Sequence, residues 1–252
     1  MRKRIYITLC MAAVIFSGCA GTQTDSLLEF PGIQWDMTMD EVLDACKINL
    51  EEAENYDVQK RVSSFSVKDY EIFGETASTV EFSFVNLELG EAQNLQEFDS
   101  EEMNGQERLV NIWVEYPKDI DRDKVLKEME KIYGKYALTE IKEFPIFNPL
   151  MGNDEMPVAG ITYRESEKIK VWGSGTIGQF IDQEEEAEFK KQWPIYLAYL
   201  DERDWESFST EGRMVTAVYS ENQAGQDNIV IQFDAYNLAV YSEIKENFLS
   251  GQ

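Results

Sequence analysis

The pattern of apolar and polar positions predicts strands in both halves of the chain. Apolar side chains recur at every second position, which is the period of a strand that buries one of its two faces. This alternation covers residues 62–67, 79–84 and 110–116 in the first half, and 158–163, 169–172, 215–219 and 229–235 in the second. We therefore expect antiparallel sheets whose strands are joined by turns and loops.

The first helix signal lies within the stretch FPGIQWDMTMDEVLDAC, residues 30–46. Thr38 and Glu41 have the spacing of a capping box, in which each side chain bonds to the backbone amide of the other residue. Met37 and Val42 have the spacing of a hydrophobic staple across the same helix start. The sequence therefore predicts a short helix whose buried face comprises Met39, Val42, Leu43 and Cys46.

Three later segments have the period of an amphipathic helix. Asp121 and Gly134 have the N-cap and C-cap positions around residues 122–133, whose apolar face comprises Val125, Leu126, Met129, Ile132 and Tyr133. An acidic helix start is predicted over 184–192, and we expect Pro194 to restart or kink the segment that follows. A closing helix is predicted over 238–248.

The order strand, loop, strand, helix occurs twice, over residues 79–133 and 213–248. The segments Asn111–Tyr116 and Asn228–Phe233 align at an offset of 117 residues. We predict an α+β fold, with antiparallel sheets and short helices packed on one face. Residues 29–135 and 136–252 then form either a tandem of two similar α+β units or one shared domain. The alternative to a duplication is that a hairpin followed by a helix is a common motif.

The first eighteen residues have the composition of a secretory signal. Arg2, Lys3 and Arg4 precede an uncharged run of 12 residues, Ile5–Phe16. As a helix this run would span about 18 Å, which is well short of the roughly 30 Å hydrocarbon core of a bilayer. We therefore interpret residues 1–18 as a signal peptide and leave them out of the fold.

Phe16-Ser17-Gly18-Cys19 follows the apolar run directly and resembles a bacterial lipobox. The resemblance implies a lipid on the sulfur of Cys19, which becomes the first residue of the mature chain. Phe16 departs from the aliphatic residue usual there, and ordinary signal cleavage after Ala20 is the alternative. With lipid on Cys19, residues 19–28 form a tether, and we expect the protein at the cell membrane, lipid-anchored and facing outside the cytoplasm.

Cysteine and charge counts extend this picture. Cys10 leaves with the signal and Cys46 stays alone, so the mature chain has no intramolecular disulfide. Loss of residues 1–18 removes three of the 23 basic residues and none of the 48 acidic ones, so the formal net charge falls from −25 to −28. Such a chain repels phosphate, which argues against nucleic acid as a partner and leaves the lipid as the membrane contact.

Several catalytic and cofactor patterns are weak or absent. The chain has no histidine, which excludes Ser-His-Asp catalysis, Cys-His catalysis and His-ligated zinc. Cys46 is therefore expected to be a small core residue. Residues 173–178, Gly-Ser-Gly-Thr-Ile-Gly, match the dinucleotide pattern without a parallel strand–helix–strand context, so we expect a glycine turn. Ser242 and Lys245 match Ser-x-x-Lys without its supporting Lys-Thr-Gly, and we expect an exposed polar pair.

The carboxylates and one tryptophan leave alternatives open. The runs Glu51-Glu52, Asp99–Glu102 and Glu184–Glu186 favour solvated faces and helix starts. Residues 99–107 and 152–155 fail the spacing of an EF-hand calcium loop. A glycosidase-like carboxylate pair stays open, because 48 acids do not select any two. Trp113 is expected to contact a partner or to pack under the second half, and packing is the favoured alternative.

Residues 35–42, within the helix entry described above, resemble small bacterial lipoproteins. These have a fold like β-lactamase inhibitor protein, or like the small lipoprotein of the outer-membrane assembly machinery. The resemblance implies a partner protein. We expect a membrane-tethered, non-enzymatic protein-binding or accessory module without catalytic residues, cofactor or metal. The alternatives are a carboxylate-based hydrolase acting on envelope carbohydrate and a divalent-cation-binding surface protein.

Overall fold

The computed structural model describes most of the chain that follows the tether. The described residues are 27–49, 53–58, 62–87, 107–136, 140–142, 162–164, 169–196, 204–221 and 228–250. Cys19, the interpreted signal peptide and almost all of the tether lie outside them, as do the acidic runs Glu51-Glu52 and Asp99–Glu102.

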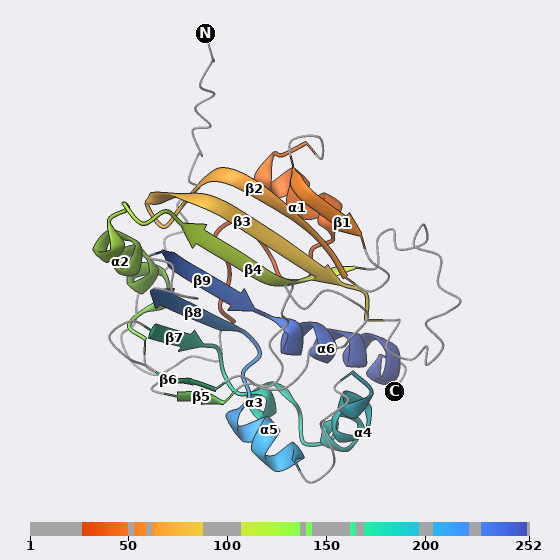
Figure 1. Cartoon of the computed structure of the whole chain (residues 1–252). Coiled ribbons are helices and arrows are strands. Elements are labelled where there is room, and N and C mark those ends of the chain that lie inside the picture. Colours follow the sequence, from red (N-terminus) through yellow and green to blue (C-terminus); the bar gives the residue numbers. More distant parts are fainter. Residues whose placement is uncertain are drawn as a thin grey trace.

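Seven strands form one sheet with the order β1-β2-β3-β4-β9-β8-β7, and all neighbours in it are antiparallel (Figure 1). A second, two-stranded antiparallel sheet joins β5 and β6. The strands are β1 (Glu54–Val58), β2 (Val62–Ile72), β3 (Glu75–Val85), β4 (Arg108–Tyr116), β5 (Glu140–Lys142), β6 (Thr162–Arg164), β7 (Ile169–Gly173), β8 (Thr216–Glu221) and β9 (Ile229–Asp234).

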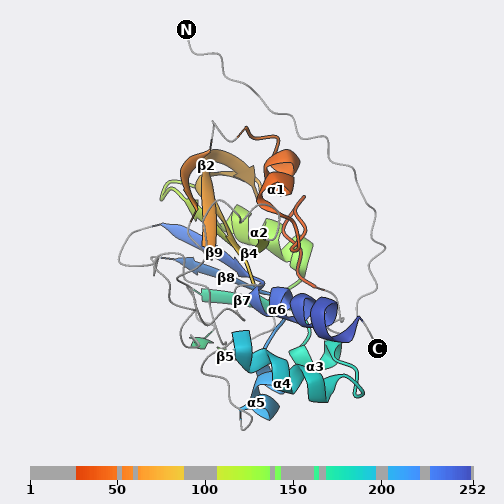
Figure 2. The ribbon, with the colours of Figure 1, turned by 90° about the vertical axis from the view of Figure 1, so that its right-hand side faces the viewer.

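The helices lie between groups of consecutive strands and complete the predicted α+β fold. They are α1 (Met39–Cys46), α2 (Arg122–Tyr133), α3 (Ile177–Phe180), α4 (Glu186–Tyr196), α5 (Trp205–Glu211), α6 (Tyr236–Ile244) and the π-helical turn η7 (Lys245–Leu249). Figure 2 shows α1, α2 and α6 on the same side of the sheet, which confirms the prediction of helices packed on one face.

The two sequence units meet within the main sheet, at the pair formed by β4 and β9. Val114 lies opposite Ile231 in this pair, and Ile112 lies opposite Phe233. Val114 and Ile231 are also related by the offset of 117 residues seen in the sequence. The pairing therefore places the two aligned segments side by side, while their origin by duplication stays a prediction.

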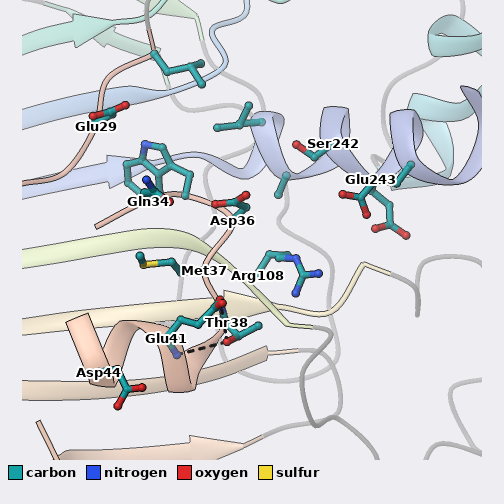
Figure 3. A pocket seen from close by; sticks show the side chains of 15 residues that line it. Glu29, Gln34, Asp36, Met37, Thr38, Glu41, Asp44, Arg108, Ser242 and Glu243 are labelled. Atoms are coloured by element: carbon teal, nitrogen blue, oxygen red, sulfur yellow. Dashed lines mark hydrogen bonds between the residues drawn. The ribbon is translucent and has the colours of Figure 1, made fainter. Parts of the chain in front are cut away.

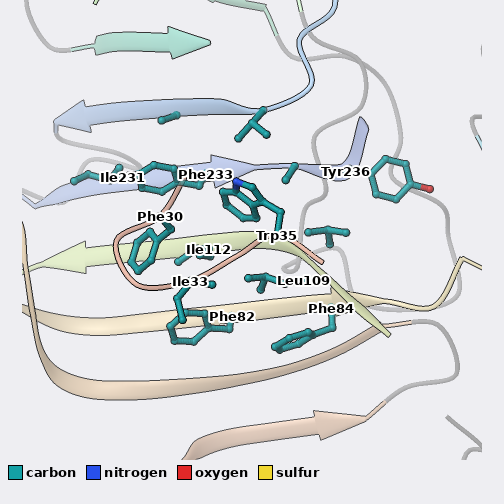
Figure 4. Close-up of a cluster of buried hydrophobic side chains, with 14 of the residues drawn as sticks. Phe30, Ile33, Trp35, Phe82, Phe84, Leu109, Ile112, Ile231, Phe233 and Tyr236 are labelled. Atoms are coloured by element: carbon teal, nitrogen blue, oxygen red, sulfur yellow. The ribbon is translucent and has the colours of Figure 1, made fainter. Parts of the chain in front are cut away.

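The main core lies between the helices and the sheet. The segment that precedes α1 crosses the central strands, and its Phe30, Ile33 and Trp35 are buried there (Figure 4). The Phe30 and Phe233 rings meet edge to face, with centroids 5.3 Å apart. This segment, which carries no strand or helix pattern, thus fills the centre of the core and fixes where α1 begins.

Two helix predictions are confirmed at their ends. Thr38 caps α1 as half of a complete capping box with Glu41, and Met39, Val42 and Leu43 are buried. Asp121 caps α2 through the amide of Lys124, and the helix ends at Gly134. Caps are readable from sequence because they depend on contacts within one turn of helix.

Two details of the helix predictions are wrong. Ile132 was placed on the buried face of α2 but is 52% exposed, because Tyr133 covers the sheet there and contacts Phe73 and Phe233. Pro194 does not restart a helix, since α4 continues through it to Tyr196. The neighbouring Trp193 is fully buried, and its packing against the aromatic side chains of α5 supports this turn. The helices α3 and α5 were not predicted.

Candidate functional site

A groove of about 850 Å³ opens between the segment preceding α1, the start of β4 and helix α6 (Figure 3). Three parts of the chain that are far apart in the sequence form its walls, so no local pattern describes it. Its lining residues are Leu27, Glu29, Gln34, Trp35, Asp36, Met37, Thr38, Glu41, Asp44, Arg108, Leu238, Ala239, Ser242, Glu243 and Glu246.

Carboxylates dominate the charge of this acidic groove. Six acidic side chains line it, and Arg108 is the one basic residue among its lining residues. Figure 3 shows the Arg108 side chain between the Thr38–Glu41 pair on one wall and Ser242 and Glu243 on the other. The excess of negative charge favours a cationic occupant, because a concave surface of one sign concentrates its field.

Hydrogen bonds hold the wall nearest α1 in place. Glu41 accepts from the backbone amide of Thr38 at 2.8 Å and from its hydroxyl at 3.1 Å. The backbone amide bond, then the hydroxyl, lowers the pKa of the Glu41 carboxyl, and Arg108 lowers it further. Glu41 therefore keeps its negative charge to a lower pH than an unperturbed glutamate does.

The same wall is anchored to the core below it. The indole nitrogen of Trp35 donates to the carbonyl of Leu28 at 2.5 Å. The amide of Leu109, in β4, donates to the carbonyl of Met37 at 3.0 Å. Trp35 is only 7% exposed, so its side chain supports the floor of the groove while the carboxylates beside it face solvent.

The serine and lysine singled out in the sequence do not form a catalytic pair. Ser242 lines the groove, but the ammonium group of Lys245 lies 3.3 Å from Glu185 and over the ring of Tyr241. Interactions with Tyr241 first, and with Glu185, raise the pKa of Lys245. A lysine held in its charged form cannot accept a proton from a serine.

The glycine pattern at residues 173–178 also has a packing explanation. Gly173 ends β7, and α3, which follows, is four residues long. A Cβ on Gly178 would meet the backbone oxygen of Ser209 at 3.0 Å, so glycine lets α3 approach α5 closely. A smaller hollow of about 370 Å³ lies beside these helices. β7 pairs with an antiparallel neighbour, and this geometry lacks the parallel unit on which dinucleotides bind.

Cys46 lies at the end of α1, half-buried against the core. Burial raises the pKa of its thiol to about 11, although its contact with the Tyr70 hydroxyl at 3.8 Å acts in the opposite direction. A thiol with this pKa is a poor nucleophile at neutral pH. The structure thus agrees with a packing role for Cys46.

Only part of the acidic runs lies among the described residues. Glu186 opens α4 as predicted for residues 184–192, and its carboxylate accepts from the indole of Trp205 at 3.3 Å. Within the described residues, no group of three or more acidic or cysteine side chains is arranged to hold a metal ion. Most of residues 99–107, and all of 152–155, lie outside those residues.

The face of the sheet opposite the helices is polar around Trp113. Trp113 is half-buried and lies between Glu81 on β3 and Gln232 on β9. Glu115 follows two positions along β4 and so shares this face. Glu81 and Glu115 are thus diagonal neighbours, the arrangement nearest to a carboxylate pair in this region, but neither lines the two hollows described above.

Comparison with protein-family models, with curated proteins and with solved structures found no match to this chain. Among the described residues, none of the helices is both long and apolar enough to pass through a bilayer. The site therefore has to be interpreted from its own geometry.

Thr38 and Glu41 on one wall of the groove and Ser242 on the other had been named from the sequence, whereas Arg108 and Glu243 had not. The capping box pointed to Thr38 and Glu41, although as a helix signal only. Arg108 and Glu243 are contributed by β4 and α6, and no spacing in the sequence relates them to residue 38. The excess of acidic residues predicted an acidic surface, but it did not predict where on that surface the carboxylates would cluster.

Proposed function

We propose that the chain is a membrane-tethered, extracytoplasmic lipoprotein that binds a partner protein through a basic segment placed in the acidic groove. The observation that carries this proposal is the lining of the groove, with six carboxylates and one guanidinium around about 850 Å³. Lysine or arginine side chains in an extended or helical segment complement that charge. The resemblance of residues 35–42 to small protein-binding lipoproteins points the same way.

The position of the groove in the chain fits a tethered module. Leu27 lines the groove and follows Cys19 by eight residues. A fully extended tether of that length spans at most about 29 Å. With lipid on Cys19, the groove is therefore held near the membrane surface, where the proposed partner would be a membrane protein or another membrane-bound chain.

The chain's role in this proposal is binding without catalysis. Support comes from the described residues, in which Lys245 is engaged by Glu185 and Tyr241 and the thiol of Cys46 has a raised pKa. Recognition by the groove needs no proton transfer, only complementary charge and shape.

Lipid attachment is tested by metabolic labelling. Cells that express the full chain are grown with labelled palmitate, and the wild type is compared with Cys19→Ala. We expect label on the wild type alone, with loss of the variant from the membrane fraction. Equal labelling of both chains would rule out Cys19 as the anchor.

The binding role is tested by capture from detergent-solubilised native membranes. The bait variant carries Asp36→Asn, Glu243→Gln and Glu246→Gln, which remove three groove charges. A matched control carries Asp119→Asn, Glu130→Gln and Glu184→Gln, which remove three charges elsewhere. We expect one protein, held by the wild type and the control, to be lost from the groove variant. Equal recovery by all three baits would contradict the proposal.

A further inference from the structure

The polar face of the sheet contains a group of side chains with unmet hydrogen bonds. Ser83 on β3 lies directly opposite Asn111 on β4. Asn111 is fully buried and Ser83 is 1% exposed. Neither the Ser83 hydroxyl nor the two polar atoms of the Asn111 amide have a hydrogen-bond partner. Such groups lose their hydrogen bonds to water without gaining others, so native proteins rarely keep them unpaired without a reason.

A carboxylate without a counter-charge lies next to this pair. Glu81 is two positions from Ser83 along β3, so both side chains share the face. Among the described residues no cationic side chain pairs with Glu81, and burial alone raises the pKa of its carboxyl. Lys68, which lies on the same face of β2, is paired with Glu54 at 2.5 Å. The Glu81 carboxylate is therefore available to pair with a bound cation.

An aromatic face completes the group. Trp113 lies directly opposite Glu81 and is half-buried, so part of its indole is open to solvent. We call Glu81, Ser83, Asn111 and Trp113 the amine cluster.

We infer that the amine cluster is a binding site for a primary ammonium group, either that of a free alkylamine or that of a lysine side chain. The amide oxygen of Asn111, the hydroxyl oxygen of Ser83 and the carboxylate of Glu81 are acceptors, and a primary ammonium brings three donors and no acceptor. A cation also meets the Glu81 charge and is attracted to the face of an indole. A quaternary ammonium has no N–H to donate, and a neutral alcohol has no charge, so both fit less well.

The site is distinct from the acidic groove. The groove lies beside α1 and α6, on the side of the sheet that the helices cover. The cluster uses strand residues whose side chains point to the opposite face, since Phe82 and Ile112, which alternate with them, lie in the main core. Each site can therefore be altered without touching the other.

The test uses the full mature chain labelled with 5-fluorotryptophan and observed by fluorine NMR. The chain has five tryptophans, and Trp113→Phe assigns the relevant signal. Butylammonium is titrated to about 100 mM at constant ionic strength, a range that covers the weak affinity expected of so small a ligand. Tetramethylammonium and n-butanol are titrated in parallel.

We expect butylammonium to shift the Trp113 signal in a saturable way, with the other four signals unchanged. Tetramethylammonium and n-butanol are expected to bind about tenfold more weakly or not at all. An equal response to tetramethylammonium or n-butanol, or no saturable shift, would overturn the inference. Nα-acetyl-lysine amide is the second ligand, and tighter binding than butylammonium identifies a lysine-bearing peptide as the source, whereas weaker binding identifies a free amine.

Variants distinguish binding at the amine cluster from general attraction of cations by the acidic protein. Glu81→Gln is expected to weaken butylammonium binding about tenfold or more, and the unchanged signals of the other tryptophans report that it is folded. The groove variant with Asp36→Asn, Glu243→Gln and Glu246→Gln is expected to bind butylammonium like the wild type. Unchanged binding in Glu81→Gln, or loss in the groove variant alone, would refute the cluster as the site, whatever the outcome of the capture experiment.

Discussion

The acidic groove and the amine cluster both favour cations, but their polar groups are in opposite states. In the groove, Glu41 is held by Thr38, and five of the six acidic side chains are exposed to solvent. In the cluster, Ser83 and Asn111 are buried and have no partner. A solvated groove attracts by summed charge, which salt screens over about 10 Å. Unpaired buried groups act by direct hydrogen bonds, which salt weakens far less. The two regions therefore differ in how their binding can be disturbed.

The largest expected effect is on binding of a basic peptide to the groove. A fluorescent heptalysine peptide is titrated against the wild type, the triple groove variant and the triple control variant of equal net charge. Three surface charges at roughly 0.5–1 kcal/mol each should weaken binding about ten- to a hundredfold in the groove variant. Fluorescence anisotropy measures this. Equal loss in the control would show that net charge, and not the groove, attracts the peptide.

A smaller effect, on stability, concerns the unpaired amide of the cluster. Asn111→Leu replaces a buried unsatisfied group by an apolar one of similar size and should raise the free energy of unfolding by about 1–3 kcal/mol. Asn237→Leu is the matched control, because Asn237 donates to the Arg213 carbonyl at 2.9 Å. The control should lose stability in urea unfolding. A similar loss in both variants would mean that Asn111 is satisfied in solution.

Removal of the α1 cap should cost less. Thr38→Ala deletes the hydroxyl that takes part in the capping box with Glu41, and loss of an N-cap costs about 1 kcal/mol. Urea unfolding at neutral pH measures this change. A Thr38→Ser variant keeps the hydroxyl and should retain most of the stability, so equal losses in both variants would speak against the cap.

The smallest expected effect is a change in the pH dependence of folding stability when Glu81 is replaced. Burial raises the pKa of this carboxyl above its unfolded value. Its contribution to stability is therefore complete below the unfolded pKa and is lost as the pH rises through the folded pKa. Glu81→Gln should match the wild type near pH 3 and exceed it at pH 7. Thermal unfolding at both values checks this, and a variant less stable than the wild type at pH 7 would contradict it.

The sequence predicted features that depend on near neighbours in the chain. Period-two alternation located β3, β4, β8 and β9, and the capping residues Thr38 and Asp121 marked where α1 and α2 begin. Such signals rest on strand pleat and on bonds within one helical turn, so they survive without tertiary information.

The rest depended on contacts between distant segments. α4 runs through Pro194 because Trp193 packs on α5, and propensity alone favours a break there. The groove joins the segment before α1 to α6, and the cluster depends on the register of β3 with β4. The pattern of apolar and polar residues along the chain does not specify which residues of two strands lie opposite each other, nor which distant segments form a groove.

The most direct test of the central claim is site-specific photo-crosslinking in native membranes. A photoreactive amino acid replaces Gln34, an exposed residue of the groove lining, or Lys118, an exposed residue beyond the other end of β4. The account predicts an adduct at position 34, none at 118, a lysine- or arginine-rich peptide at the crosslink, and loss of the adduct in the triple groove variant. An adduct at both positions alike, or a crosslinked peptide without basic residues, would contradict it.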